Sequence, residues 1–547
     1  MYRQAIFFAG LFLILVIFVW RDLSVNNEQL PEVTSPTVDD AREFVERAAN
    51  QLEQFSRDAG GIAWLRDGYI TEDSNRLADR SEQSYHRLNY DLAREAQAYL
   101  TLELPDDLHR QIVILNAGAS LPVGETAKER AEIVLARQRL QDEPSPENLF
   151  RWVEIINLDA RRLGFKDVTA LWSVKYEMPP EQIFTELDRL WKAIKPLQDA
   201  LTVSARKAQS ALPVGKVGSD PWGSWRELLP IVYPEGEAHR LVLDGLLKDS
   251  SMDIRQMARM SEAFNTSIGL PQLPDTFWER SRFDTPVDHE MNCRPTGWSV
   301  LSRTDVRVSV CGSDAGSDEF RWLQRILPFL YYDLGFSNQP TIYGAVPHLG
   351  FHFAHGYMNV LSLSPAYLQQ VGLLDPGADL GSEMATLVEQ AYSDIPSMAY
   401  MIAFERWRWR IFSGDIAPEN YVSAWIELIN RYQGVPIDDA EIMSSPLLTA
   451  GDDFVWRALS VPMRYQFFEQ ACLLAKNEGP LHQCSFFEAP AVGDYLSGML
   501  EMGRSKPWPL ALEAFTGSQQ MQADSLIRYF APLAGWLSNR GAGGASD

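Results

Sequence analysis

The sequence of 547 residues predicts a mostly α-helical protein with little β-structure. Long stretches place apolar residues about three to four positions apart, which is the spacing of one face of an α-helix. Examples are Ala127–Leu140, Pro146–Leu163 and Pro180–Ser204. The alternation of apolar and polar residues that is typical of strands is scarce, and its best example is the short segment Thr304–Val310. These patterns favour a helical core with at most a minor sheet.

The chain begins with a flank at residues 1–4 and an unbroken apolar run at residues 5–20, Ala5 to Trp20. The run is slightly shorter than the ~20 residues of a typical transmembrane helix, but charged and aromatic flanks can extend such a span. A cleaved signal peptide is the alternative, although no clear pair of small residues marks a cleavage site after Trp20. We therefore expect a transmembrane signal anchor at residues 5–20, by which the protein contacts the membrane.

Residues 21–37 are polar and contain Pro31 and Pro36, so we expect a linker there. The pattern becomes strongly helical from Val38, and two acidic residues follow at once, as the positive end of a helix dipole favours. At the other end, residues 541–547 are rich in glycine and alanine and predict a flexible tail.

Charge and motifs exclude several classes of function. The net charge of −24 argues against nucleic acid or an anionic membrane surface as a partner. The sequence contains no phosphate-binding loop, no dinucleotide-binding glycine motif and no serine-hydrolase elbow. We expect the acidity simply to keep a large globular domain soluble.

Motifs in a fixed order organise the chain around residues 293–374. Cys293–Trp298 comes first, then Arg321–Tyr332, then Gly350–Tyr357. Runs rich in Trp, Gly and Pro lie on both sides of this centre, at Ser267–Pro271, Pro274–Trp278, Arg406–Phe412, Gly479–Cys484 and Lys506–Pro509. In order and spacing these motifs resemble the M2 peptidases, the angiotensin-converting-enzyme family of zinc peptidyl-dipeptidases.

The resemblance covers residues 38–540 and implies one large, two-lobed, zincin-like helical domain around a deep internal cleft. The sequence alone allows three pairings of its four cysteines, or four buried thiols. The family's bridges imply the pairs Cys293–Cys311 and Cys472–Cys484. Disulfides form in oxidising compartments, so these pairs would place the bulk of the chain outside the cytoplasm. Together with the short N-terminal anchor, they lead us to expect an inner-membrane protein with its bulk in the periplasm.

The residues that would hold the metal are replaced. A helical H-E-x-x-H supplies two zinc ligands and a general base, and a later Glu supplies the third ligand. Aligned on Tyr331-Tyr332, Gln324 and Pro328 stand at the two histidine positions, Arg325 at the general base and Phe353 at the third ligand. An amide, a cation and an aromatic ring cannot hold Zn²⁺ or deprotonate its water. We therefore expect no zinc cofactor and no catalytic residue.

Two further consequences follow at this centre. Pro328 lacks an N–H and disfavours a helix interior by roughly 3 kcal/mol, so we expect the local helix to be bent or shortened. The aspartate that supports the metal ligands in the family corresponds to Tyr357.

Other positions of the family's cleft are partly retained. Arg464 and Tyr465 look like the chloride-linked arginine and the transition-state tyrosine. Asp453 stands where a lysine binds the carboxylate of a peptide, so we expect it to repel that group in a cleft of low dielectric. Ile429 replaces an arginine of the second halide site, so chloride binding is doubtful.

An alternative metal site is offered by His348, His352 and His355, which would share one face of a continuous helix. The adjacent Pro347 and Gly350 instead place His348 in a turn before the helix. Histidines at the surface or satisfied in a core are several times more common than metal ligands, so this site is the weaker interpretation.

The sequence thus predicts a membrane-anchored, catalytically inactive M2 homologue that binds a peptide or a protein partner. The alternative is an active metallopeptidase, similar to a dipeptidyl carboxypeptidase, with metal ligands that the family does not use. A third interpretation is a scaffold whose acidic surface binds a partner.

Overall fold

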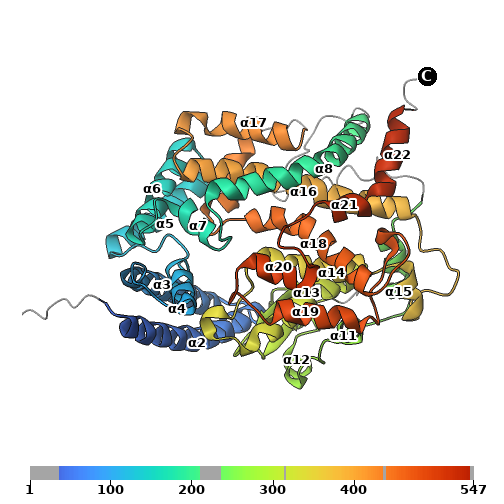
Figure 1. The fold of residues 1–547 in the computed structure, drawn as a ribbon, viewed down its shortest axis with the longest axis horizontal. Coiled ribbons are helices and arrows are strands. Elements are labelled where there is room, and N and C mark those ends of the chain that lie inside the picture. The colour runs from blue at the N-terminus through green and yellow to red at the C-terminus, as the bar shows by residue number, and fades with distance from the viewer. Residues whose placement is uncertain (1–35, 210–235, 313–315, 435–438, 543–547) are drawn as a thin grey trace, which may run out of the picture.

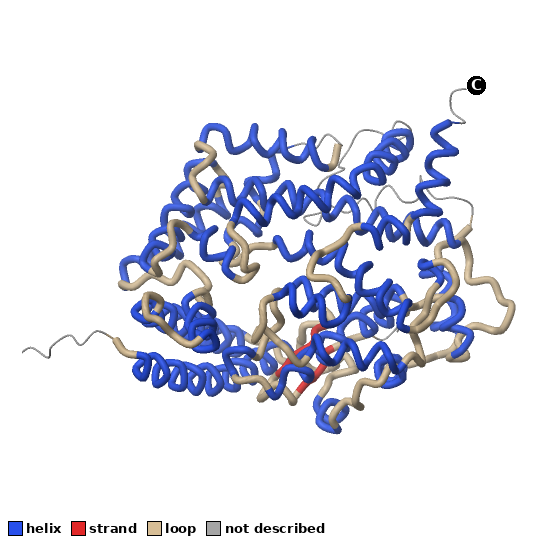
Figure 2. Tube along the Cα trace, in the orientation of Figure 1, coloured by secondary structure: helices blue, strands red, loops and turns tan. Residues whose placement is uncertain are grey.

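The structure, a computed structural model, describes residues 36–209, 236–312, 316–434 and 439–542. It is built mainly of α-helices (Figures 1 and 2). From the N-terminus the helices are α2 (Val38–Gly68), α3 (Glu72–Ala96), α4 (Asp106–Asn116), α5 (Ala127–Asp142), α6 (Pro146–Arg162), α7 (Val168–Val174), α8 (Pro180–Gln209), α10 (His239–Asp249), α11 (Ile254–Ser267) and α12 (Asp275–Arg280). They continue as α13 (Ser317–Gly335), α14 (Leu349–Leu361), α15 (Pro365–Gln370), α16 (Glu383–Phe412), α17 (Tyr421–Tyr432), α18 (Val455–Leu474), α19 (Pro490–Leu500), α20 (Trp508–Thr516), α21 (Asp524–Tyr529) and α22 (Ala531–Ala542).

The predicted helical and strand segments are confirmed. α5, α6 and α8 begin at the residues that their apolar periodicity indicated. Strand β2 (Val306–Ser309) lies within the segment that alternates apolar and polar residues, and it pairs antiparallel with β1 (Thr296–Ser299). This two-stranded sheet is the red element in Figure 2.

The first described helix, α2, begins at Val38 behind a complete capping box. The Asp40 N–H donates to the Thr37 hydroxyl at 3.2 Å, and the Thr37 N–H donates to the Asp40 carboxylate at 2.8 Å. Helices α2, α3 and α4 pack together at the lower left of Figure 1 around a small core of their own that includes Phe44 and Ile112. The remaining helices share one much larger core.

Helix α13 corrects the expectation of a shortened helix at Pro328. The helix runs without interruption from Ser317 to Gly335, and Pro328 is buried inside it. A proline removes one backbone donor and crowds the preceding turn, but here packing of the α13 side chains into the large core outweighs that penalty.

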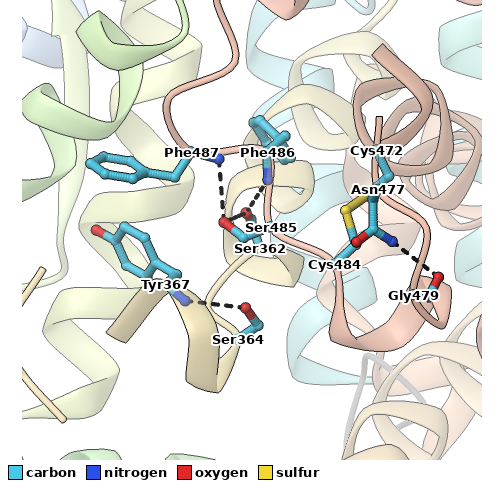
Figure 3. Close-up of a disulfide and its surroundings, with 10 residues drawn as sticks. All are labelled: Ser362, Ser364, Tyr367, Cys472, Asn477, Gly479, Cys484, Ser485, Phe486 and Phe487. Atoms are coloured by element: carbon cyan, nitrogen blue, oxygen red, sulfur yellow. Dashed lines mark hydrogen bonds between the residues drawn. A yellow bond between two sulfur atoms is a disulfide. The ribbon is translucent and has the colours of Figure 1, made fainter. Parts of the chain in front are cut away.

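Both predicted disulfides are present, Cys293–Cys311 and Cys472–Cys484. The second joins the end of α18 to the loop before α19 (Figure 3). Just after this bridge, the N–H of Phe486 donates to the Ser362 hydroxyl at 3.2 Å, which attaches the loop to the end of α14.

The predicted anchor at residues 5–20 lies outside the described residues, as do linker residues 21–35 and tail residues 543–547. No helix within the described ranges is long and apolar enough to cross a membrane. The predicted tail is helical at residues 541 and 542, where α22 ends.

Candidate functional site

Helix α14 packs between α13 and α18 near the middle of the view in Figure 1. It approaches α13 closely at Gly356, where a Cβ would overlap the Arg325 carbonyl and the Phe329 ring. This approach is available only to glycine, and it brings the α13 positions of the predicted metal motif against the α14 position of the predicted third ligand.

The two residues at the expected histidine positions are buried in the core. Gln324 is 0% exposed and lies beside the Tyr367 hydroxyl. Burial raises the pKa of Tyr367. Pro328 offers only its carbonyl, which lies against the ring of His355. Neither residue presents a donor of the kind that a zinc ion prefers.

Phe353, at the position of the third ligand, is part of an aromatic stack. Its ring is stacked on Trp456 of α18, with centroids 4.5 Å apart. It also meets the ring of Phe329 of α13 edge-on at 5.1 Å. The place where the family's carboxylate would lie is therefore apolar, and it is well packed.

Arg325, at the position of the general base, is paired with a tyrosine. Its Nη1 donates to the hydroxyl of Tyr357 at 3.0 Å, and its guanidinium lies 5.3 Å from the centre of the same ring. The guanidinium of Arg464 lies over that ring at 4.0 Å. Burial raises the pKa of Tyr357, but the two guanidinium charges lower it more, so it lies below the usual value for tyrosine.

Arg464 and Tyr465 both bind one buried carboxylate, Asp394 of α16. The Arg464 Nη1 lies 2.8 Å from one oxygen of Asp394, and the Tyr465 hydroxyl donates to the other at 2.6 Å. Gln390 also donates to Asp394, at 2.8 Å. Burial and the charge of Asp394 hold the pKa of Tyr465 well above its usual value. The retained pair therefore forms an internal network, and the tyrosine proton is directed at Asp394.

Asp453 does not present the bare negative charge that the sequence suggested. Its side chain is 0% exposed, and one oxygen lies 2.7 Å from the Lys175 ammonium. The other oxygen accepts from the Tyr176 hydroxyl at 2.6 Å and from the Val455 N–H at 3.0 Å. The expected repulsion of a ligand carboxylate is therefore wrong in its premise, because Lys175 compensates the charge.

The three histidines of the alternative metal site have separate roles. His348 caps α14, as the flanking proline and glycine predicted, and its Nδ1 accepts from the Gly350 N–H at 3.2 Å. His352 stacks on Phe329 at 5.0 Å, with Nε2 3.3 Å from Asp333. His355 is 0% exposed. Burial lowers the pKa of both His348 and His355 to about 3.

The donor chemistry does not fit a zinc ion at either location. The aligned positions supply an amide, a guanidinium, a proline carbonyl and a phenyl ring. Within the part of the chain that the structure describes, no three His, Cys, Asp or Glu side chains lie close enough to share a metal ion. The histidine trio is therefore not assembled into a site.

Comparison with known proteins identifies the family of the chain. A family model described as Peptidase_M2, angiotensin-converting enzyme, matches residues 137–544, so the chain belongs to the M2 peptidase family. The angiotensin-converting enzyme of Bos taurus is 28% identical over 410 residues, which cover 71% of this chain and 31% of that protein. The angiotensin-converting enzyme of Theromyzon tessulatum is 26% identical over 491 residues, which cover 85% of this chain and 78% of that protein.

The enzyme of Rattus norvegicus is 28% identical over 405 residues, which cover 70% of this chain and 30% of that protein. The chain thus spans under a third of the mammalian relatives and most of the one from Theromyzon tessulatum.

Several residues of the site were not found from the sequence. Asp394, Lys175 and Tyr176 contact their partners across 70 or more positions of the chain. Arg321 lies one turn before Arg325 on α13. The spacing of these two arginines was a usable signal, because residues four apart share a helix face.

Proposed function

We propose that this protein is a catalytically inactive member of the M2 peptidase family that retains a binding role toward a peptide or a protein partner. The observation that supports this most directly is the stack of Phe353 on Trp456, beside Arg325 bound to Tyr357. A peptidase of this type needs a metal-bound water and a carboxylate base. Here a phenyl ring and a guanidinium stand at two of the required positions.

The remaining candidate groups do not replace this machinery. The hydroxyl of Tyr465 could stabilise an oxyanion by about 3–4 kcal/mol at best, and it donates to Asp394 instead. Loss of the general base alone lowers a rate by roughly 10²- to 10⁴-fold. Loss of the metal removes the nucleophile as well.

Metal analysis of the purified full-length protein, alongside a dipeptide-release assay, tests the proposal. We expect no stoichiometric zinc and no dipeptidyl carboxypeptidase activity, with or without added Zn²⁺ and chloride. One bound Zn²⁺ per chain that is lost on His352→Ala or His355→Ala would favour an active enzyme with unusual ligands. Turnover that a chelator abolishes would overturn the proposal.

We also propose that the apolar run at residues 5–20 anchors the protein in the inner membrane, with the domain in the periplasm. The two disulfides support an oxidising compartment. A C-terminal reporter that is active only in the cytoplasm would contradict this topology, and a mature N-terminus after Trp20 would show that the segment is cleaved. The resemblance further implies that a two-lobed domain encloses the binding region in a deep cleft.

A further inference from the structure

We propose that Arg321, Arg325 and Tyr357 form a binding site for an oxyanion, that is, for a carboxylate or a phosphate group. The site replaces the metal centre and gives the proposed binding function a chemical class of ligand. The inference rests on that proposed function, because a zinc ion bound at this place would be repelled by the positive charges of these arginines.

Helices α13 and α14 pack against each other, and the three groups lie along their line of contact, called the seam below. Arg321, Arg325 and Phe329 are spaced four residues apart on α13, so they share one face of that helix. On α14, Phe353 and Tyr357 have the same spacing. Phe329 contacts Phe353, and Arg325 contacts Tyr357, which shows that the two helices run antiparallel.

Arg321 follows as the next position along this seam, one turn beyond Arg325 on the side away from the aromatic stack. The seam therefore changes from aromatic to cationic along its length. Arg321, Arg325 and Tyr357 are each partly exposed, which access by a small ion from solution requires.

The charges at this end of the seam are not balanced. Among the described residues, no carboxylate lies within ion-pair distance of Arg321 or Arg325. The adjacent Arg464 is paired with Asp394. Arg464 therefore has a contacting carboxylate and the other two guanidinium groups do not, in a chain whose net charge is −24.

Acidic side chains farther from Arg321 are already bound elsewhere. Glu389 accepts from Arg240 at 2.8 Å, and Asp318 lies 3.6 Å from the same arginine. Burial lowers the pKa of Arg321 below its usual value. The negative charge of Glu389 raises this pKa, but the positive charge of Arg240 lowers it again. Half-buried guanidinium groups without a counter-ion are unfavourable, and an anion from solution would relieve that cost.

The donors suit an oxyanion specifically. A guanidinium presents a planar fork of N–H groups that matches two oxygens of a carboxylate or phosphate, which a spherical halide cannot use in the same way. The Tyr357 oxygen already accepts from Arg325, so its own hydrogen is free to donate. No described acceptor takes that hydrogen, and an oxygen of the ligand would do so.

Titration calorimetry of the full-length protein tests the site, with inorganic phosphate and succinate as probes at constant ionic strength and chloride as a third arm. We expect saturable binding of at least one oxyanion. Arg321→Gln and Arg325→Gln should each weaken it by about tenfold or more, because each removes a charge-assisted hydrogen bond. Tyr357→Phe should weaken it by a smaller factor. The matched control is Arg410→Gln, an exposed arginine at the end of α16, which should leave the affinity unchanged.

Thermal unfolding provides a second measurement. In buffer without oxyanions, Arg321→Gln should raise the thermal midpoint, since it removes an unpaired half-buried charge, and added phosphate should then stabilise the variant less than the unmodified protein. Phosphate binding alone would identify a phosphorylated ligand, and succinate binding alone would identify an acidic peptide or organic acid.

Three results would overturn the site: no oxyanion binding, equal affinity in Arg325→Gln, or binding of chloride in preference to both oxyanions. These results are separate from a failure of the proposed function. Peptidase activity would defeat that function and leave the titration as it is, whereas absent oxyanion binding in an inactive protein would defeat only the site.

Discussion

Replacing Lys175 with methionine tests the charge pair that holds α7 against the start of α18. The substitution removes the ammonium 2.7 Å from Asp453, whose side chain is 0% exposed. Two hydrogen bonds to Asp453 would remain, from Tyr176 and from the Val455 N–H, but the negative charge would have no counter-ion. Removing one partner of a fully buried pair destabilises a protein by about 3–5 kcal/mol.

The Lys175 side chain is 32% exposed, so water would screen part of that loss, and we expect about 3 kcal/mol. At roughly 2 °C per kcal/mol for a large chain, the thermal midpoint should fall by about 6 °C. Circular dichroism during heating measures it. The double variant Lys175→Met/Asp453→Asn should recover most of the loss, because neither side chain of this pair then carries a charge.

Lys195→Met provides the matched control, since Lys195 pairs with Asp199 at 2.6 Å on the surface, with 45% and 59% of the two side chains exposed. Exposed pairs contribute about 0–1 kcal/mol. The reasoning would be refuted if Lys175→Met and Lys195→Met lowered the midpoint equally, or if the double variant were no more stable than Lys175→Met alone.

Three further predictions concern acid stability, the second disulfide and the metal motif. The lowered pKa values of His348 and His355 mean that the unfolded chain binds more protons between about pH 6.5 and 3. Stability should therefore fall as the pH drops through that window, by up to about 1.4 kcal/mol per pH unit for each group. His355→Phe should reduce this slope in denaturant titrations repeated at several pH values; an unchanged slope would contradict the assignment. The Cys472–Cys484 bridge joins residues 12 positions apart, so Cys472→Ser/Cys484→Ser should lower the free energy of unfolding by about 3 kcal/mol. Urea unfolding measures this change, and an unchanged urea midpoint in the variant would contradict the prediction. The family's metal motif would be introduced by four substitutions, Gln324→His, Arg325→Glu, Pro328→His and Phe353→Glu. We expect this variant to bind zinc, measured by metal analysis, but to release little dipeptide. Full turnover would contradict this expectation and show that the rest of the cleft is intact.

The sequence could predict what depends on local pattern. Apolar periodicity located α5, α6 and α8, and the proline and glycine around His348 placed that residue before α14. Motif order identified the family, and with it both disulfides.

Interactions between distant segments were not predictable from such patterns. Asp453 was expected to repel a ligand carboxylate because its partner Lys175, which compensates its charge, lies 278 positions earlier in the chain. Pro328 looked like a helix breaker because local propensity omits the surrounding core. The link from Tyr465 to Asp394 joins two helices whose packing no spacing rule reports.

The aromatic stack of Phe353 on Trp456 bears on whether the family's metal ligands could be introduced here one mutation at a time. Phe353→Glu alone would insert a carboxylate among apolar rings before any metal was there to neutralise it. Such a step would lower stability and confer no activity. The same holds in turn for a histidine placed at Gln324, which is 0% exposed. Because a metal site needs several changes at once, a route that begins with either of these two substitutions passes through a less stable chain. The packing at Phe353 and Gln324 thus opposes the stepwise assembly of the family's metal site.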